Sequence, residues 1–179
     1  MKSAKIFLAG MYLHLALSVA VPAVILFAGR WEALGEGLFV FYLVFLLLLQ
    51  VIGWGTVAVA ARAGARRETD RLVRAWKLLK LGSVPFFVLN FLYSAAVWFV
   101  LVAAFRGIFA IFLPIPIAIT CLLVVETGCI GCFVLKAFRR QRPPVPGKVH
   151  YLLQFIPVLD VVSTLVILSW VKKRTTPQF

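Results

Sequence analysis

The chain has 179 residues, of which 63% are hydrophobic and 14% charged, and its mean hydropathy is +1.03. An average soluble domain is about half apolar and a quarter charged, and a chain of this size cannot bury so much apolar surface in one small core. A soluble domain is therefore excluded. The net charge of +13 does not indicate nucleic-acid binding, because the basic residues lie in short segments between apolar runs, as in membrane proteins.

Five apolar segments are predicted to be transmembrane helices. A bilayer core needs about 20 helical residues at about 1.5 Å per residue, and the segments that qualify are 6–29, 38–61, 81–104, 108–135 and 151–171. The first is too long for the apolar core of a signal peptide, so we interpret it as a retained span. The predicted fold is an all-α, polytopic membrane helical bundle, with residues 1–179 forming a single integral membrane domain.

The basic residues predict the orientation of these helices. The N-terminus, the loop 62–80 and the loop 136–149 together carry 14 Lys and Arg residues, against five on the other side. The positive-inside rule therefore predicts a cytoplasmic N-terminus in a cell membrane, a pattern typical of small bacterial membrane proteins. If the last segment is instead re-entrant or interfacial, its basic tail returns inside and the ratio becomes 17 to two. We favour five spans, because terminal charges often fail to override a long apolar helix.

The loop 62–80 contains an amphipathic pattern. One helical face would carry apolar side chains, and the other would carry basic ones; the residues are Leu72, Val73, Trp76 and Leu79 on the first face and Arg71, Arg74 and Lys77 on the second. A basic amphipathic helix of this kind is typical of a segment that lies on a membrane surface with anionic headgroups. The alternative is a cytoplasmic extension of the third span, and the pattern leaves both interpretations open.

Polar residues recur at one depth in the predicted spans. In the last segment they form a stripe with spacings of 4, 3, 3 and 4, at His150, Gln154, Pro157, Asp160 and Thr164. Counted from the inner ends, His14, Asn90, Glu126 and Asp160 all lie about 13–15 Å deep, and Gln50 lies slightly deeper. This layer predicts a polar binding site composed of Asp160, Glu126, His14, Asn90, Gln50, Gln154 and Thr164.

The two acids of this layer, Glu126 and Asp160, have no basic residue at their depth on the predicted spans. A charged carboxylate there costs about 2.5–3.5 kcal/mol even on the lenient insertion scale. We therefore expect a transporter, a channel or a ligand-binding protein whose acids bind a cation, a proton or a small polar ligand. One alternative is that the acids only accept hydrogen bonds that hold the bundle together. Another is an accessory or scaffold subunit that binds a partner protein or anionic lipid.

Cys129 and Cys132 form a C-x-x-C motif that can support thiol–disulfide chemistry. In that feature alone the chain is similar to quinone-linked membrane disulfide oxidoreductases. The orientation rule places the motif toward the reducing cytoplasm, so a thiol oxidoreductase is only the third hypothesis and we do not expect an enzyme. His14, His150 and the cysteines lack the spacing of metal ligands, and we expect no metal and no cofactor. Five spans do not divide into two repeats, which leaves a homo-oligomer or a partner membrane subunit open.

Overall fold

The computed structural model describes residues 2–27, 32–66, 68–104, 114–141 and 147–175, and within them the regular structure is entirely α-helical. The helices are α1 (Lys2–Phe27), α2 (Glu32–Ala65), α3 (Thr69–Ala104), α4 (Pro114–Gln141), α5 (Val149–Leu153) and α6 (Pro157–Thr175). The four long helices each contain a segment long and apolar enough to cross a membrane, at Lys2–Val21, Gly37–Ala65, Thr69–Val97 and Ile117–Arg140. The prediction of a helical bundle is confirmed to that extent. The first residues of the predicted fourth span, 108–113, lie outside the described part of the chain.

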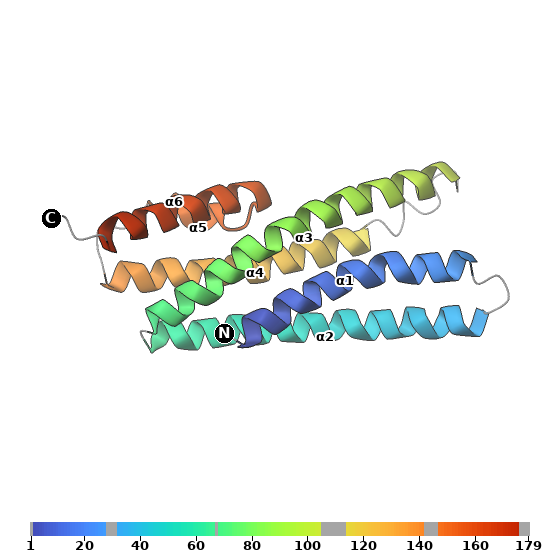
Figure 1. Cartoon of the computed structure of the whole chain (residues 1–179), viewed down its shortest axis with the longest axis horizontal. Coiled ribbons are helices and arrows are strands. Elements are labelled where there is room, and N and C mark those ends of the chain that lie inside the picture. The colour runs from blue at the N-terminus through green and yellow to red at the C-terminus, as the bar shows by residue number, and fades with distance from the viewer. Residues whose placement is uncertain (1, 28–31, 67, 105–113, 142–146, 176–179) are drawn as a thin grey trace.

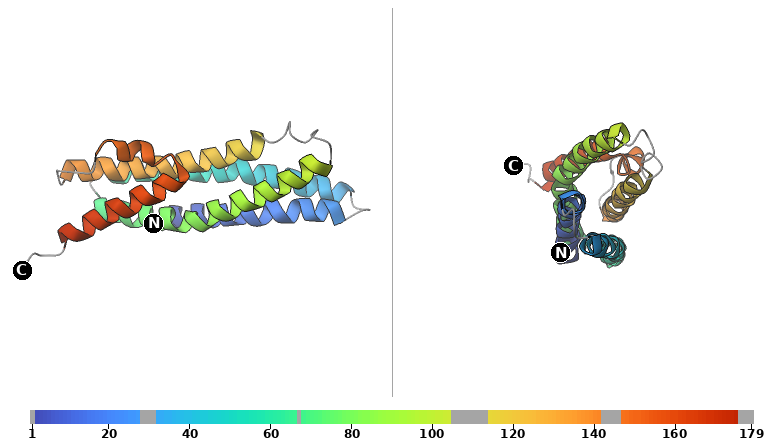
Figure 2. Two further views of the ribbon diagram at one scale, coloured as in Figure 1. Left: turned by 90° about the horizontal axis from the view of Figure 1, so that it is seen from above. Right: turned by 90° about the vertical axis from the view of Figure 1, so that its right-hand side faces the viewer.

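The long helices form an antiparallel bundle (Figures 1 and 2). α1 and α3 run in one direction and α2 and α4 in the other. α1 packs against α2 and α3, and α4 packs against the same two helices from the other side. We call the end of the bundle where α2 stops at Ala65, α3 starts at Thr69 and α4 stops at Gln141 the basic end, because it carries the basic segments recognised in the sequence.

The start of α3 decides between the two interpretations of the amphipathic segment that the sequence left open. α3 is continuous from Thr69, so the amphipathic segment is an extension of the third span and not a separate surface helix. Its apolar face packs into the bundle, where Leu72 and Leu79 belong to the core and Trp76 is 0% exposed. The prediction that Trp76 lies at a membrane surface is therefore wrong. The reason is that the apolar face found protein partners in the bundle instead of lipid.

The predicted helix over 151–171 is broken in two. α5 ends at Leu153 and α6 begins at Pro157, with a tight turn between them in which the amide of Phe155 donates to the carbonyl of Leu152 (3.1 Å). A proline removes the amide donor that a continuous helix needs, and it clashes with the carbonyl four residues earlier. α6 then runs back along α5 toward the basic end (Figure 1). Its apolar part, Leu159–Ser169, is shorter than a membrane span, so the five-span prediction is not confirmed.

Two glycines of α4 provide the seat for this α5–α6 hairpin. A Cβ atom at Gly128 would lie 2.8 Å from the backbone oxygen of Gln154, and one at Gly131 would overlap the side-chain amide of Gln154. The turn between α5 and α6 can therefore approach α4 closely only because both positions lack a side chain. Nearby, the thiol of Cys132 donates a weak hydrogen bond to the carbonyl of Tyr151 in α5 (3.8 Å).

Candidate functional site

The seven polar residues predicted to share one site are buried or half-buried, but the structure connects them to different neighbours. In α1, the ring of His14 stacks on that of Tyr42 in α2, with 3.1 Å between Nδ1 of His14 and the tyrosine hydroxyl. In α3, Asn90 donates from Nδ2 to the hydroxyl of Thr120 in α4 (3.0 Å). Both side chains thus have partners that tie neighbouring helices together, which is a sufficient structural role for them.

Asp160 has a counter-charge. Its Oδ2 accepts a hydrogen bond from Nζ of Lys80 at 2.5 Å, and the two side chains are 9% and 2% exposed. The expectation that the buried acids have no basic partner is therefore wrong for Asp160. Lys80 follows Trp76 by four residues and Leu72 by eight, which places it on the buried face of α3. That spacing from the apolar residues of α3 indicates that Lys80 is buried. In the sequence analysis, Lys80 is instead counted among the basic residues of the loop 62–80.

The hairpin gathers further polar groups beside this ion pair. Ser163 of α6, which the sequence analysis did not single out, has its hydroxyl 2.8 Å from Nδ1 of His150 and accepts from Nε2 of Gln154 at 3.3 Å. Gln154 and Thr164 are fully buried. The predicted polar stripe therefore does not run along one continuous helix. It is divided between α5 and α6, and the hairpin brings its two parts into contact.

Glu126 has no such partner. Its side chain is 0% exposed, and neither Oε1 nor Oε2 accepts a hydrogen bond from any residue that the structure describes. The carboxylate points at Gly53 of α2, where a Cβ atom would overlap it. Gln50 lies one turn before Gly53 on the same side of α2, and both polar atoms of its amide are buried without a partner among the described residues. Glu126 is therefore an unsatisfied polar side chain at the interface of α2 and α4, and Gln50 is a second one, a turn away on α2.

The chemistry of this interface suits a small cation. A buried carboxylate without donors is costly unless a positive charge accompanies it, and carboxylate and amide oxygens are ligands that hard cations prefer. Divalent ions of this type are usually bound by several acidic side chains, whereas this interface contributes one. Over the described ranges, no group of three His, Cys, Asp or Glu residues is arranged to hold a metal ion. A proton or a monovalent cation is the occupant that fits one carboxylate and one amide.

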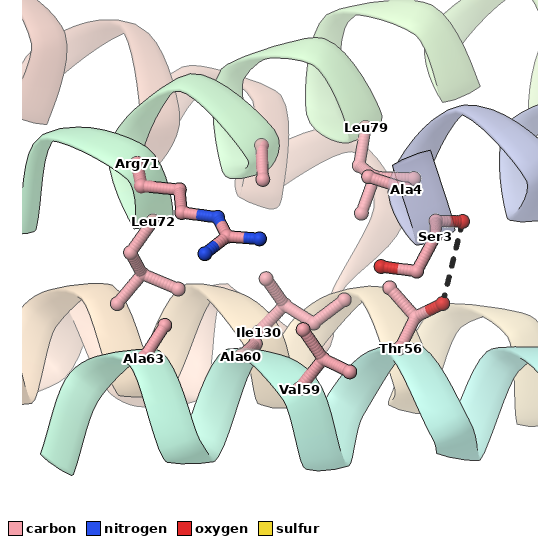
Figure 3. Close-up of a pocket in the computed structure, with 11 residues that line it drawn as sticks. Ser3, Ala4, Thr56, Val59, Ala60, Ala63, Arg71, Leu72, Leu79 and Ile130 are labelled. Atoms are coloured by element: carbon pink, nitrogen blue, oxygen red, sulfur yellow. Dashed lines mark hydrogen bonds between the residues drawn. The ribbon is translucent and has the colours of Figure 1, made fainter. Parts of the chain in front are cut away.

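The predicted membrane-surface residues Arg71, Arg74 and Lys77 lie exposed on α3 at the basic end. Arg71 donates to Oε2 of Glu68 at 3.1 Å. Its side chain lines a hollow of about 20 Å³ between α1, α2, α3 and α4, which has room for about one water. Figure 3 shows this hollow, with the bond from Thr56 to the carbonyl of Ser3 on its other side. The hollow is too small for a ligand, and the burial of Trp76 leaves only the basic residues of the predicted surface group facing outward.

Cys129 and Cys132, the residues of the oxidoreductase hypothesis, are free thiols and half-buried, and Cys121 is free and exposed. Cys132 contacts the backbone of α5 as described above. This contact gives Cys132 a role in packing the hairpin, and a redox role of Cys129 and Cys132 stays an untested hypothesis.

The fold and these contacts define a class: a helical-bundle protein with four helices that are long and apolar enough to cross a membrane. Within this class, the chain belongs to the family of unknown function DUF6652, whose model matches residues 2–173. No curated protein matches the chain, and neither does any solved structure. The family description names no activity, so a function has to be argued from the site itself.

Proposed function

We propose that the chain is an integral membrane protein that binds a proton or a small monovalent cation at Glu126, between α2 and α4, as part of a transport or channel activity. One observation carries the proposal: the carboxylate is fully buried and no described residue donates a hydrogen bond to it. Asp160, the other predicted acid, is ion-paired with Lys80 and is assigned a structural role. Of the seven residues predicted to form the binding site, only Glu126 and Gln50 are therefore proposed to bind the cation.

Gly53 supports this assignment. The carboxylate of Glu126 occupies the space that any larger residue at position 53 would need. Because the overlapping atoms are the end of a flexible side chain, a methyl group there would displace the carboxylate without unfolding the helix pair. Gly55, two residues further along α2, has no heavy atom within 4 Å of the corresponding position. Substitution by alanine should therefore disturb the site at Gly53 and leave it unchanged at Gly55, so that Gly55→Ala is the matched control.

We further propose that the N-terminus and the C-terminus both lie on the cytoplasmic side of a cell membrane, with α5–α6 as a re-entrant hairpin. The support is that α6 ends near the basic end of the bundle, where the other basic segments lie (Figure 1). This arrangement corresponds to the 17-to-two distribution of basic residues, which obeys the positive-inside rule better than five full spans do. A reporter that is active only in the cytoplasm, fused after residue 179, tests it, and we expect that fusion to be active. An inactive fusion, together with activity of a second reporter that works only outside the cytoplasm, would contradict the arrangement.

The cation site is tested with the full chain reconstituted into liposomes. Proton movement is followed with an enclosed pH dye, and uptake of Na⁺ or K⁺ is followed in parallel. We expect wild type and Gly55→Ala to bind or transport one of these cations. In Glu126→Gln and Gly53→Ala, the transport rate or the affinity for that cation should fall at least tenfold. Wild-type transport or binding that survives in Glu126→Gln would overturn the proposal.

Thermal unfolding separates the occupants. If the occupant is an alkali ion, the melting temperature of wild type rises with its concentration, because a ligand that binds only the folded state stabilises it. Glu126→Gln should then show no such rise. If the occupant is a proton, the alkali ion changes the melting temperature of neither wild type nor Glu126→Gln. Only the proton-movement assay then distinguishes the two proteins. A wild type that binds and moves no cation, together with a destabilised Glu126→Gln, would favour the alternative in which the acids only hold the bundle together.

A further inference from the structure

A second hollow, of about 110 Å³, opens at the basic end between the last turns of α2 and α4. Its volume is several times the roughly 10–15 Å³ that one water needs. The described residues that line it are Ala61, Gly64, Ala65, Phe133, Lys136, Ala137 and Arg140, so that no side chain among them on the α2 side is larger than a methyl group. The hollow is separate from Glu126, which does not line it.

The charge of this hollow comes from two basic residues of α4. Lys136 and Arg140 are one turn apart and exposed, and none of the described residues that line the hollow is acidic. Neither of them forms an ion pair within the part of the chain that the structure describes. Arg139, between them, points elsewhere, since its guanidinium lies 5.0 Å from the centre of the Tyr151 ring in α5. Arg139 thus fastens the hairpin, while Lys136 and Arg140 face the hollow.

The position of the hollow indicates what kind of anion it accepts. Basic residues in the last turn of a helix are also stabilised by the helix dipole, but that effect requires no hollow and no wall of small residues. Further from the basic end, Trp54 lies two turns before Ala61 on the same side of α2 and is 47% exposed. A ligand with a phosphate in the hollow and an apolar chain along α2 would contact both features, whereas a free phosphate would contact only the first.

We infer that this hollow binds the phosphate of an anionic phospholipid headgroup, with Lys136 and Arg140 as its counter-charges. The small residues Ala61, Gly64 and Ala65 let the headgroup approach between the two helices, and the acyl chains lie along the exposed apolar side of α2. The inference stands on the hollow and its two cations, and it does not depend on cation binding at Glu126.

The test uses the full chain in detergent, depleted of lipid, with phosphatidylglycerol as the probe and phosphatidylcholine as the neutral comparison. Binding is followed by native mass spectrometry and by the shift in melting temperature. We expect wild type to bind one phosphatidylglycerol about 25-fold more tightly than phosphatidylcholine, roughly fivefold for each cation. The double variant Lys136→Gln/Arg140→Gln should lose this preference. The charge-matched control Arg74→Gln/Lys77→Gln, at the same end but outside the hollow, should stay within twofold of wild type.

A second variant separates the hollow from general surface charge. Gly64→Leu fills the space and keeps both cations, and an added Cβ at Gly64 meets its nearest neighbours only at 3.7 and 3.9 Å. We expect it to lose the preference as the double variant does; Ala61→Leu serves the same purpose if Gly64→Leu does not fold. Equal loss in the control pair, or full binding in both filled variants, would overturn the inference. Inorganic phosphate that competes as well as the lipid would show a free-phosphate site and would also overturn it.

Discussion

Asp160 and Glu126 are both buried carboxyl groups in apolar helices, but only Asp160 has a polar partner among the described residues. Asp160, in α6, is ion-paired with Lys80 of α3 across the helix contact. Glu126, in α4, faces a glycine and receives no hydrogen bond from any described residue. A charged residue in an apolar segment is by default a candidate for function. The comparison shows that the partner supplied by folding, and not depth or charge, distinguishes the two acids.

The largest effect should come from Lys80→Met. It removes the only positive charge paired with Asp160 among the described residues and leaves a buried carboxylate, which typically costs about 3–5 kcal/mol. Denaturant unfolding in detergent measures the loss, and Lys77→Met, on the exposed side of α3, is the control. The double variant Lys80→Met/Asp160→Leu should recover most of the stability. A single variant as stable as wild type would show that the ion pair is not needed.

The next largest effect should come from Gly128→Leu, which places a side chain against the backbone of Gln154 and unseats the hairpin that carries Asp160. Overpacking of this kind costs about 1–3 kcal/mol. Gly55→Leu, where the added side chain meets open space, should leave the free energy of unfolding within about 1 kcal/mol of wild type. Protease susceptibility of α5–α6 provides the second measurement. Equal stability of the two variants would mean that the close seat on α4 contributes nothing.

A smaller effect should follow from Ser163→Ala. The hydroxyl of Ser163 connects His150 and Gln154 of the hairpin to α6. Its loss should cost about 0.5–1.5 kcal/mol of unfolding free energy, the usual contribution of one hydrogen bond. Ser169→Ala, whose exposed hydroxyl bonds only to its own helix, is the control and should be neutral. Indistinguishable melting temperatures for the two variants would argue against the polar junction.

The smallest change in stability should come from Glu126→Gln. Since no described residue bonds to the carboxylate, the amide loses no partner, and we expect the free energy of unfolding to change by less than about 1 kcal/mol. Asp160→Asn, by contrast, leaves Lys80 without its counter-charge and should cost about 3 kcal/mol. Thermal unfolding of the two variants side by side measures the difference directly. A larger loss for Glu126→Gln than for Asp160→Asn would reverse the roles assigned to the two acids.

The long helices could be predicted from the sequence because length and hydropathy are local properties. The apolar runs of α1 to α4 identify them without any tertiary information. The break at Pro157 was also readable, since proline interrupts a helix, but membrane helices tolerate proline often enough that the residue alone did not decide. The direction in which α6 leaves the turn depends on the glycine seat of α4, which is a tertiary property.

The site was predictable only as a set of candidates. The sequence identified both acids and Gln50, but a depth count cannot tell which side chains face each other across two helices. Lys80 was missed because a lysine next to a basic loop was counted with the loop, although its spacing from Trp76 places it on the buried face. Gly53 has no side chain and therefore no signal of its own until Glu126 is placed against it.

The contact between Lys80 and Asp160 also has a consequence for the order of assembly. The two residues are 80 positions apart, and the chain is made from its N-terminus, so Lys80 is synthesised with its counter-charge still missing. Near the basic end, its long side chain can keep the ammonium group in water until then. Burial of Lys80 therefore has to wait for α6. The docking of the C-terminal hairpin is then the event that pairs Lys80 with Asp160 and completes its burial.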